Sequence, residues 1–372
     1  MKKLVVLLCT LLALGSSAQA LEVSAPSALL MEKETGTVLF AKDEHAKLEP
    51  ASVTKVMTLL LTMEAIDAGQ LHYDDVVTAS AHACSMGGSQ IWLKENEQMT
   101  VSDMLKAVCV VSANDCAVAL AETVAGSEEA FVERMNQRAA ELGMADTHFC
   151  NATGLPAEGH VTSAYDIALM SRELIRNHPD IRQYTTIWMD SLRGGASQLV
   201  NTNKLVRHYS GATGLKTGTT SKAGHCLSAT AERGGLGLAA VILGCETTDE
   251  RFGGARKMLD YGFANYSIYT PEVDTSQLTP VPVIHGVAEQ AEPVADEPQP
   301  VLLKKGQEKQ VACSVQMAED LEAPVLKGQV IGRIVVTLGE EQLAEYPIRA
   351  AEEVKRLGFG GAFKQLMCAL LS

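Results

Sequence analysis

Hydrophobic and polar residues are arranged in two different ways along the chain, with a change near Pro271. Before this residue, long stretches without glycine or proline place apolar residues at helical spacing. These stretches predict helices over residues 51–65, 128–142, 165–176 and 249–266, and two more between residues 100 and 125. Shorter apolar runs predict strands on both sides of Thr35-Gly36 and over residues 215–220, 226–230 and 236–244. Because short turns join the last three strands, we expect an α/β fold in which helices flank an antiparallel sheet, rather than a doubly wound sheet.

The chain after Pro271 predicts a small, separate all-β domain. Strands are expected over residues 281–284, 310–315, 332–338 and 342–349, and helical periodicity is absent until the C-terminal end. The acidic, proline-rich residues 289–300 form either a linker or an edge or loop within this domain. A chain of 372 residues exceeds a typical single domain. We therefore expect a first domain over residues 21–270 and a β-rich domain over residues 271–352.

The first 20 residues have the pattern of a signal peptide. Two lysines precede an apolar run over residues 4–14, and Ala18-Gln19-Ala20 supplies the small residues of a cleavage site. The run is shorter than the ~20 residues that a membrane-spanning helix needs. We expect export, a mature chain that begins at Leu21, and a location outside the cytoplasm at the outer face of the cytoplasmic membrane.

Residues 353–372 predict an amphipathic C-terminal helix. Four apolar residues share one of its faces: Phe359, Phe363, Leu366 and Leu370. At ~1.5 Å of rise per residue the helix is too short to cross ~30 Å of hydrocarbon, but it can lie in the membrane interface. Three glycines weaken it. A helix docked on the protein, or a frayed tail, is therefore the alternative to a membrane anchor.

Composition narrows the range of functions. The formal charge of −14 excludes a nucleic-acid-binding protein, because phosphates need a basic partner. Aromatic residues make up only 5% of the chain, so extensive stacking surfaces for sugars or bases are not expected. The cysteines after Cys9 are irregularly spaced without a CxxC pair, and the histidines have no ligand partners at useful spacing. We expect mostly free thiols, no metal and no cofactor.

Three short motifs carry the candidate chemistry: Ser52-Val53-Thr54-Lys55, Ser112-Ala113-Asn114 and Lys216-Thr217-Gly218. Each has an ordinary structural explanation by itself, since serine and asparagine favour helix caps and a strand lysine is usually solvated. All three in this order are much less expected by chance. The set is typical of penicillin-binding proteins and class A β-lactamases.

The motifs suit catalysis by a serine nucleophile. Ser52 lies at the predicted start of a helix, whose dipole favours a developing alkoxide, and Lys55 follows one turn later on the same side. A serine hydroxyl needs a base, and no histidine–aspartate pair is evident. Lys55 is therefore the candidate base, kept neutral by burial and by the second cation of Lys216. Ser112 can relay the proton to the leaving amine, and the Asn114 amide can hold both Lys55 and the substrate.

The third motif suits substrate binding. Residues 216–219 predict an edge strand, and Gly218 leaves room for an extended peptide to lie against it. The backbone N–H groups of Ser52 and Thr219 are the expected oxyanion hole. Thr217, together with a cation, can bind a terminal carboxylate, which an exopeptidase requires.

With these motifs the chain resembles the serine-type D-alanyl-D-alanine carboxypeptidases, the low-molecular-mass penicillin-binding proteins with a C-terminal β domain. Further segments extend the resemblance over nearly the whole mature chain: Thr147-His148-Phe149 with Gly154-Leu155, Asn201-Thr202-Asn203-Lys204, Ala223-Gly224-His225-Cys226-Leu227 and residues 323–332. Arg251 matches the position of the family's carboxylate-binding arginine. Thr219 stands where some relatives carry a histidine or an aromatic residue.

The resemblance implies a transpeptidase fold like that of β-lactamases and penicillin-binding proteins. It further implies hydrolysis of the terminal D-Ala-D-Ala bond of peptidoglycan stem peptides through a serine acyl-enzyme, inhibition by β-lactams, no metal, and anchoring by the C-terminal helix. A class A β-lactamase is disfavoured, because no Glu-x-x-Leu-Asn segment lies between Asn114 and Lys216 and residues 271–372 would be superfluous. A non-catalytic wall-peptide sensor has no reason to keep Ser52. Carboxypeptidase and endopeptidase activity on these peptides both remain open.

Overall fold

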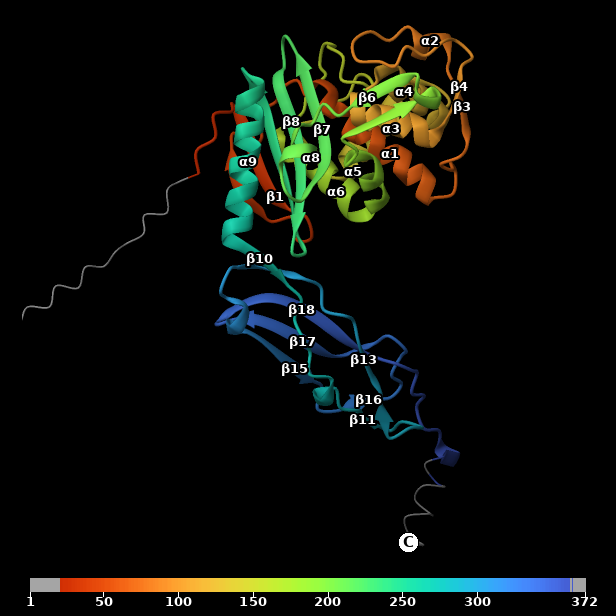
Figure 1. Ribbon diagram of the computed structural model, residues 1–372. Helices are drawn as coiled ribbons and strands as arrows, with labels where there is room; N and C mark the ends of the chain where they lie inside the picture. The colour runs from red at the N-terminus through yellow and green to blue at the C-terminus, as the bar shows by residue number, and fades with distance from the viewer. Residues whose placement is uncertain (1–20, 362, 364–372) are drawn as a thin grey trace, which may run out of the picture.

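The computed structural model describes residues 21–361 and 363, so the predicted signal peptide and half of the predicted tail helix lie outside the described residues. The first domain is built on an antiparallel sheet with helices on both faces (Figure 1). Within the described chain this sheet has five strands in the order β2-β1-β9-β8-β7. Their bounds are Ser27–Glu32 (β1), Val38–Lys42 (β2), Ala212–Thr220 (β7), Gly224–Arg233 (β8) and Leu236–Cys245 (β9).

One long helix covers one face of the sheet, and a group of helices covers the other (Figure 1). The long helix α9 (Thr248–Asn265) packs on β8 and β9. The opposite group consists of α1 (Lys55–Asp67), α3 (Val101–Val111), α4 (Asn114–Ala125), α5 (Glu128–Glu141) and α6 (Ala164–Asn177). Shorter elements at the periphery are β3 (Val76–Thr78), α2 (Ala81–Cys84), β4 (Gln98–Thr100), α7 (Arg182–Thr185), β5 (Met189–Leu192), β6 (Ser197–Val200) and α8 (Leu205–His208). The predicted α/β class is confirmed.

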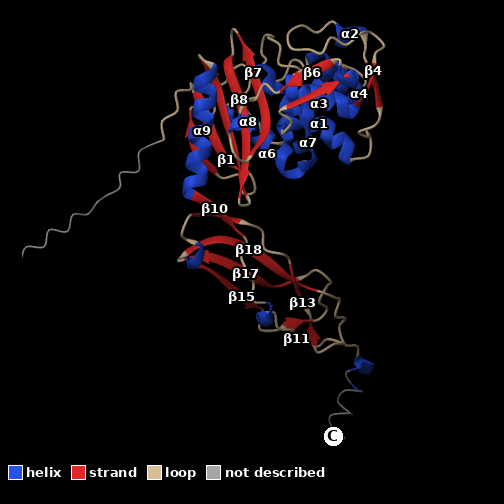
Figure 2. Ribbon diagram, in the orientation of Figure 1, coloured by secondary structure: helices blue, strands red, loops and turns tan. Residues whose placement is uncertain are grey.

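The second domain consists of short strands (Figure 2). Strand β10 (Tyr266–Tyr269) leads into it from α9 and pairs with β14 (Val301–Lys304). The other strands form two small sheets, ordered β12-β11-β16 and β13-β18-β17-β15. Their bounds are Val281–Ile284 (β11), Gln290–Ala291 (β12), Pro293–Ala295 (β13), Val311–Met317 (β15), Leu321–Glu322 (β16), Val330–Leu338 (β17) and Glu341–Ala350 (β18). The predicted all-β character is confirmed.

The start of the tail differs from the prediction. Val354 and Arg356 are not helical but form bridges with Val325 and Gly286, and the Val354 side chain is buried in the core of the β domain. Helix begins only at Phe359. The apolar side chain of Val354 is used by the domain and not by the amphipathic face. None of the described helices is both long enough and apolar enough to cross a membrane.

Candidate active site

The three motifs converge beside β7, the edge strand of the large sheet. Ser52 lies in a 3-10 turn (η1, Ala51–Thr54) that leads directly into α1, so the predicted helix begins as a tighter turn. Gly154 packs against this turn, and a Cβ atom there would lie 1.8 Å from the Ala51 carbonyl oxygen. Only glycine allows this approach, which fixes the turn that carries Ser52.

Lys55 is fully buried and held by three uncharged oxygens. Its Nζ atom donates to the Ser52 hydroxyl at 3.0 Å, to the Asn114 side-chain carbonyl at 2.5 Å and to the Thr153 backbone carbonyl at 2.7 Å. Burial, and then the positive charge of Lys216, hold the pKa of Lys55 well below its usual range. The predicted pairing of nucleophile and base is present in the geometry.

Ser112 and Asn114 occupy the sharp junction between α3 and α4. Ser112 has a left-handed backbone with φ of 65°, which ends α3, and Asn114 begins α4. The Asn114 amide donates to the Gly87 carbonyl at 2.6 Å while its oxygen accepts from Lys55, so both ends of the amide are fixed. The Ser112 hydroxyl is buried and has no hydrogen-bond partner among the described residues, which leaves it available to a bound substrate.

Lys216 is buried on β7, with 1% of its surface exposed. Its Nζ atom donates to the Thr217 carbonyl at 2.9 Å. Burial, with a smaller contribution from the positive charge of Arg251, lowers the pKa of Lys216 to about 7. The burial of Lys216 therefore excludes the alternative explanation that it is an ordinary, solvated strand lysine.

Gly218 has a structural reason in addition to the predicted one. A Cβ atom at this position would lie 2.6 Å from the Pro50 carbonyl oxygen and 3.0 Å from the Ser52 amide nitrogen. The missing side chain therefore lets β7 approach the nucleophile turn, and does not serve only to leave room for a substrate. This contact places the Ser52 N–H beside the edge strand.

Arg251 reaches the end of β7 from the first turns of α9. One guanidinium nitrogen donates to the Gly218 carbonyl at 3.2 Å, the Thr219 hydroxyl at 3.1 Å and the Cys226 carbonyl at 3.3 Å. Within the described part of the chain its Nε is buried without a hydrogen-bond partner. Burial lowers the pKa of Arg251. Arg251 is thus a buried cation whose hydrogen-bond partners are all uncharged. Two of these partners, Gly218 and Thr219, follow Thr217, the predicted carboxylate-binding threonine.

Three residues that support the motifs were not singled out from the sequence as site residues. Thr153 supplies a backbone carbonyl to Lys55, which no side-chain pattern can reveal. The Thr202 hydroxyl lies 2.7 Å from the Thr217 hydroxyl, and its segment was noticed only through the family resemblance. The third is His160, a buried histidine behind the nucleophile turn.

His160 orders the turn through Thr54. Its Nδ1 atom accepts from the Cys150 backbone N–H at 3.0 Å, so its proton is on Nε2, 2.8 Å from the Thr54 hydroxyl. That hydroxyl in turn donates to the Ala51 carbonyl at 2.9 Å. Burial lowers the pKa of His160 to about 4. The neutral ring therefore positions the turn that carries Ser52.

One group among the described residues has metal-ligand spacing, near the far end of α1, and consists of Glu64, Glu173 and His178. Arg138 already pairs with both glutamates, at 2.7 and 2.6 Å. Both carboxylates are thus already paired with a guanidinium. This arrangement does not suit a cation. Seven cysteines of the described chain are free thiols.

Comparisons with known proteins show the family of the chain. The family model described as D-alanyl-D-alanine carboxypeptidase matches residues 15–247, and that of the penicillin-binding protein 5 C-terminal domain matches residues 271–356. The chain is 42% identical to D-alanyl-D-alanine carboxypeptidase DacF of Bacillus subtilis, over 95% of this chain and 92% of that protein. It is 33% identical to DacC of Escherichia coli, over 95% and 90% of the two chains.

Solved structures give the same result. Penicillin-binding protein 5 from Haemophilus influenzae superposes with a TM-score of 0.79 at 29% identity, over 90% of this chain and 98% of that one. Penicillin-binding protein D2 from Listeria monocytogenes, in its ampicillin-bound form, superposes with a TM-score of 0.60 at 32% identity, over 65% and 99%. The chain therefore belongs to the D-alanyl-D-alanine carboxypeptidase family and ends in a domain of the penicillin-binding protein 5 C-terminal type.

Proposed function

We propose that this protein hydrolyses the terminal D-Ala-D-Ala bond of peptidoglycan stem peptides through an acyl-enzyme on Ser52. The observation that carries the proposal is the Lys55 amine, 3.0 Å from the Ser52 hydroxyl, with a pKa held well below its usual range. An amine whose pKa is lowered in this way gives up its own proton more readily and can then take the serine proton.

Acylation follows from the placement of the groups. The Ser52 oxygen attacks the penultimate D-Ala carbonyl while its proton passes to Lys55. The negative oxygen that forms lies toward the N–H groups of Ser52 and Thr219. As the C–N bond breaks, the leaving D-alanine takes a proton, which Ser112 relays. Water then attacks the ester and regenerates the Ser52 hydroxyl. No metal or cofactor is needed for these steps.

Substrate binding uses the edge strand and the cation behind it. Among the described strands β7 pairs only with β8, so an extended peptide can add to its other edge by backbone pairing. Arg251 and Thr217 bind the terminal carboxylate, because a buried guanidinium with only uncharged partners gains most from an anionic ligand. A β-lactam acylates the same serine and inhibits the enzyme.

Mass analysis of wall fragments tests the proposal. The enzyme should shorten a stem pentapeptide by one D-alanine, and Ser52→Ala should not. Release of D-alanine from the pentapeptide, with cross-linked dimers left intact, identifies a carboxypeptidase. Cleavage of dimers with an intact pentapeptide would identify an endopeptidase and contradict the proposal.

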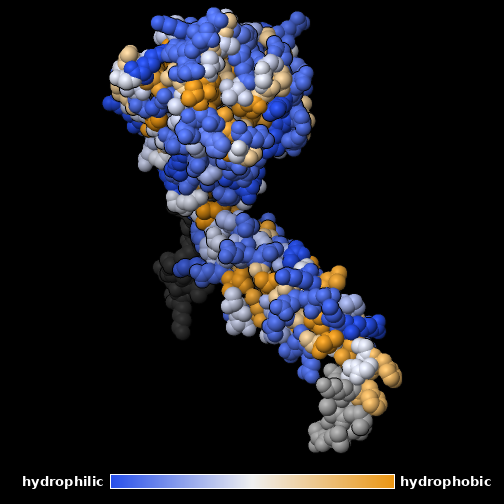
Figure 3. Space-filling view, turned by 90° about the vertical axis from the view of Figure 1, so that its right-hand side faces the viewer, coloured by the Kyte–Doolittle hydropathy of each residue, from blue (hydrophilic) through white to orange (hydrophobic). Residues whose placement is uncertain are grey.

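We further propose that the protein acts outside the cytoplasm, at a membrane surface. Several apolar side chains are exposed in the β domain (Figure 3). Val287 and Leu326 are among them, and each lies next to a residue bridged to the 354–357 segment. Phe359, with 91% of its surface exposed, begins the tail helix directly after that segment. These side chains support an interfacial contact that includes the base of the tail.

A further inference from the structure

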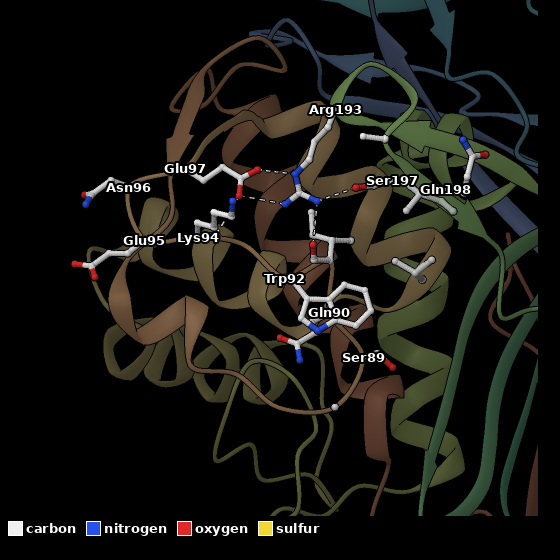
Figure 4. A pocket seen from close by; sticks show the side chains of 15 residues that line it. Ser89, Gln90, Trp92, Lys94, Glu95, Asn96, Glu97, Arg193, Ser197 and Gln198 are labelled. Atoms are coloured by element: carbon white, nitrogen blue, oxygen red, sulfur yellow. Dashed lines mark hydrogen bonds and ion pairs between the residues drawn. The ribbon is translucent and has the colours of Figure 1, made fainter.

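A pocket of about 1060 Å³ adjoins the candidate active site and has no part in the steps above. The loop before β4 and the β5–β6 hairpin line it (Figure 4). Two contacts connect it with the catalytic junction. Val111, a lining residue, directly precedes Ser112, and the carbonyl of Ser89, another lining residue, accepts from the Asn114 backbone N–H at 2.7 Å. A substrate bound at the junction can therefore extend into the pocket.

An exposed indole stands in this pocket. Trp92 has 74% of its surface exposed, while its neighbours Ile91 and Leu93 are buried. Its backbone φ is 57°, a left-handed conformation that bulky residues rarely adopt. Such strain persists only where the surrounding structure enforces it, and it concentrates at functional positions.

Buried and paired groups fix the backbone on both sides of this indole. The fully buried Asp115 carboxylate accepts from the N–H groups of Ile91 at 3.1 Å and Leu93 at 3.0 Å. Arg193 donates to the Ile91 carbonyl at 2.9 Å and pairs with Glu97 at 2.6 Å (Figure 4). The outward position of the indole is thus built into the fold.

The rest of the lining combines apolar side chains, from Ile91, Val111, Ala196 and Leu199, with polar side chains that carry no net charge. Two cations and two anions balance one another: Lys94, Arg193, Glu95 and Glu97. Uncharged amides and hydroxyls also line the pocket, from Ser89, Gln90, Asn96, Ser197 and Gln198. A surface of this kind matches an uncharged ligand that has one apolar face and many hydroxyl or amide groups.

We propose that this pocket binds the N-acetylated sugar to which the stem peptide is attached, with a sugar ring face stacked on Trp92. This inference rests on the proposed function, which supplies the stem peptide. An extended chain spans ~3.3–3.6 Å per residue, so the roughly four residues between sugar and scissile bond allow a separation of up to about 14 Å. The stem peptide itself, which carries carboxylates, is a poorer match for a lining without net charge. Composition argued against extensive sugar-stacking surfaces, and this site uses a single indole.

Tryptophan fluorescence tests sugar binding without turnover. The chain has two tryptophans, Trp92 and Trp188. A full-length Ser52→Ala, Trp188→Phe protein therefore reports on Trp92 alone, and the matched Ser52→Ala, Trp92→Phe protein reports on Trp188. Titration with a disaccharide of N-acetylglucosamine should give a saturable emission change in the first protein and none in the second. No change in the first, equal changes in both, or a response to the bare stem peptide in place of the sugar would overturn the proposal.

Kinetics give an independent test on the active enzyme. The ratio of kcat/KM for a disaccharide-linked pentapeptide to that for the bare pentapeptide should exceed one in the wild type, by roughly two- to tenfold for one aromatic stacking contact. Trp92→Ala should bring this ratio to about one. A ratio that Trp92→Ala leaves unchanged would overturn the inference. Failure of the wild type to release D-alanine from the bare peptide would instead contradict the proposed function.

Discussion

The Nζ atom of Lys55 lies 3.0 Å from the Ser52 Oγ atom, and the other groups that hold it there are also uncharged oxygens. An ammonium group in this position would lack a compensating carboxylate in contact, and burial and Lys216 both lower its pKa. Once the amine has lost its proton, its lone pair can accept the serine proton over this short distance. The division of roles between the two lysines follows from this relationship.

Substitution by arginine separates these roles. Lys55→Arg should nearly abolish acylation at every accessible pH, because arginine does not release its proton. Lys216→Arg keeps the cation and should retain measurable acylation with weaker substrate binding. In the wild type the acylation rate should rise with pH as Lys55 loses its proton. Single-turnover penicillin acylation from neutral to alkaline pH measures all three. Substantial acylation by Lys55→Arg with an inert Lys216→Arg would reverse the assignment.

Arg251 should confer preference for a free C-terminal carboxylate. A charge-assisted hydrogen bond contributes ~1.5–3 kcal/mol, so Arg251→Ala should lose roughly ten- to a hundredfold in kcat/KM on the acid peptide. The loss on the matching C-terminal amide should be much smaller. Arg256→Ala removes an exposed arginine from the same helix and is the control. Equal losses on the acid and the amide would show that Arg251 only holds Gly218 and Thr219 in place.

His160 should make the protein less stable in acid. The pKa of His160 is about 4 in the folded protein, against an ordinary value of 6.5. Between pH 6.5 and pH 4 the unfolded chain therefore binds more protons than the folded protein, and a falling pH favours unfolding. The free energy of unfolding should drop by about 3 kcal/mol from pH 6.5 to 4 through this group. Denaturant unfolding of His160→Gln should show a flatter acid limb, whereas the exposed-site control His72→Gln should not. Parallel acid limbs in the wild type and His160→Gln would exclude this role.

The structure shows that a deletion of the tail should begin after Leu357. Val354 and Arg356 pair with the β domain, so a deletion from residue 354 would disturb that domain. A chain that ends at Leu357 keeps these contacts. It should lose binding to vesicles that contain anionic lipid and still turn over a soluble D-Ala-D-Ala peptide like the full chain. Co-sedimentation measures the binding. Equal vesicle binding by both chains would assign the membrane contact elsewhere.

Much of the first domain could be predicted from the sequence. Its long helices carry apolar residues at 3.6 spacing, and β8 and β9 are bounded by turn residues that include Gly234 and Gly235. The catalytic motifs could be predicted because each keeps its chemistry within a few consecutive residues. For these helices, strands and motifs, the local sequence pattern was sufficient for the prediction.

The missed features depend on contacts between distant segments. Strands β12 and β16 are two residues long, and only their partner β11 defines them as strands. The first residues of the predicted tail helix are not helical. Val354 instead forms a bridge with Val325, and its side chain packs in the core of the β domain. The reason for Gly218 likewise depends on the Ser52 turn, more than 150 residues earlier in the chain. Such relationships leave no periodic signal in the sequence.

Peptide mapping after reaction with a labelled penicillin tests the central claim most directly. The label should form a single adduct, in the peptide that contains Ser52, because among the described residues only that hydroxyl has a buried amine in contact and an N–H group beside the edge strand. Ser52→Ala, with its fold checked by thermal unfolding, should carry no label. An adduct on any other residue, or labelling that persists in Ser52→Ala, would contradict the account.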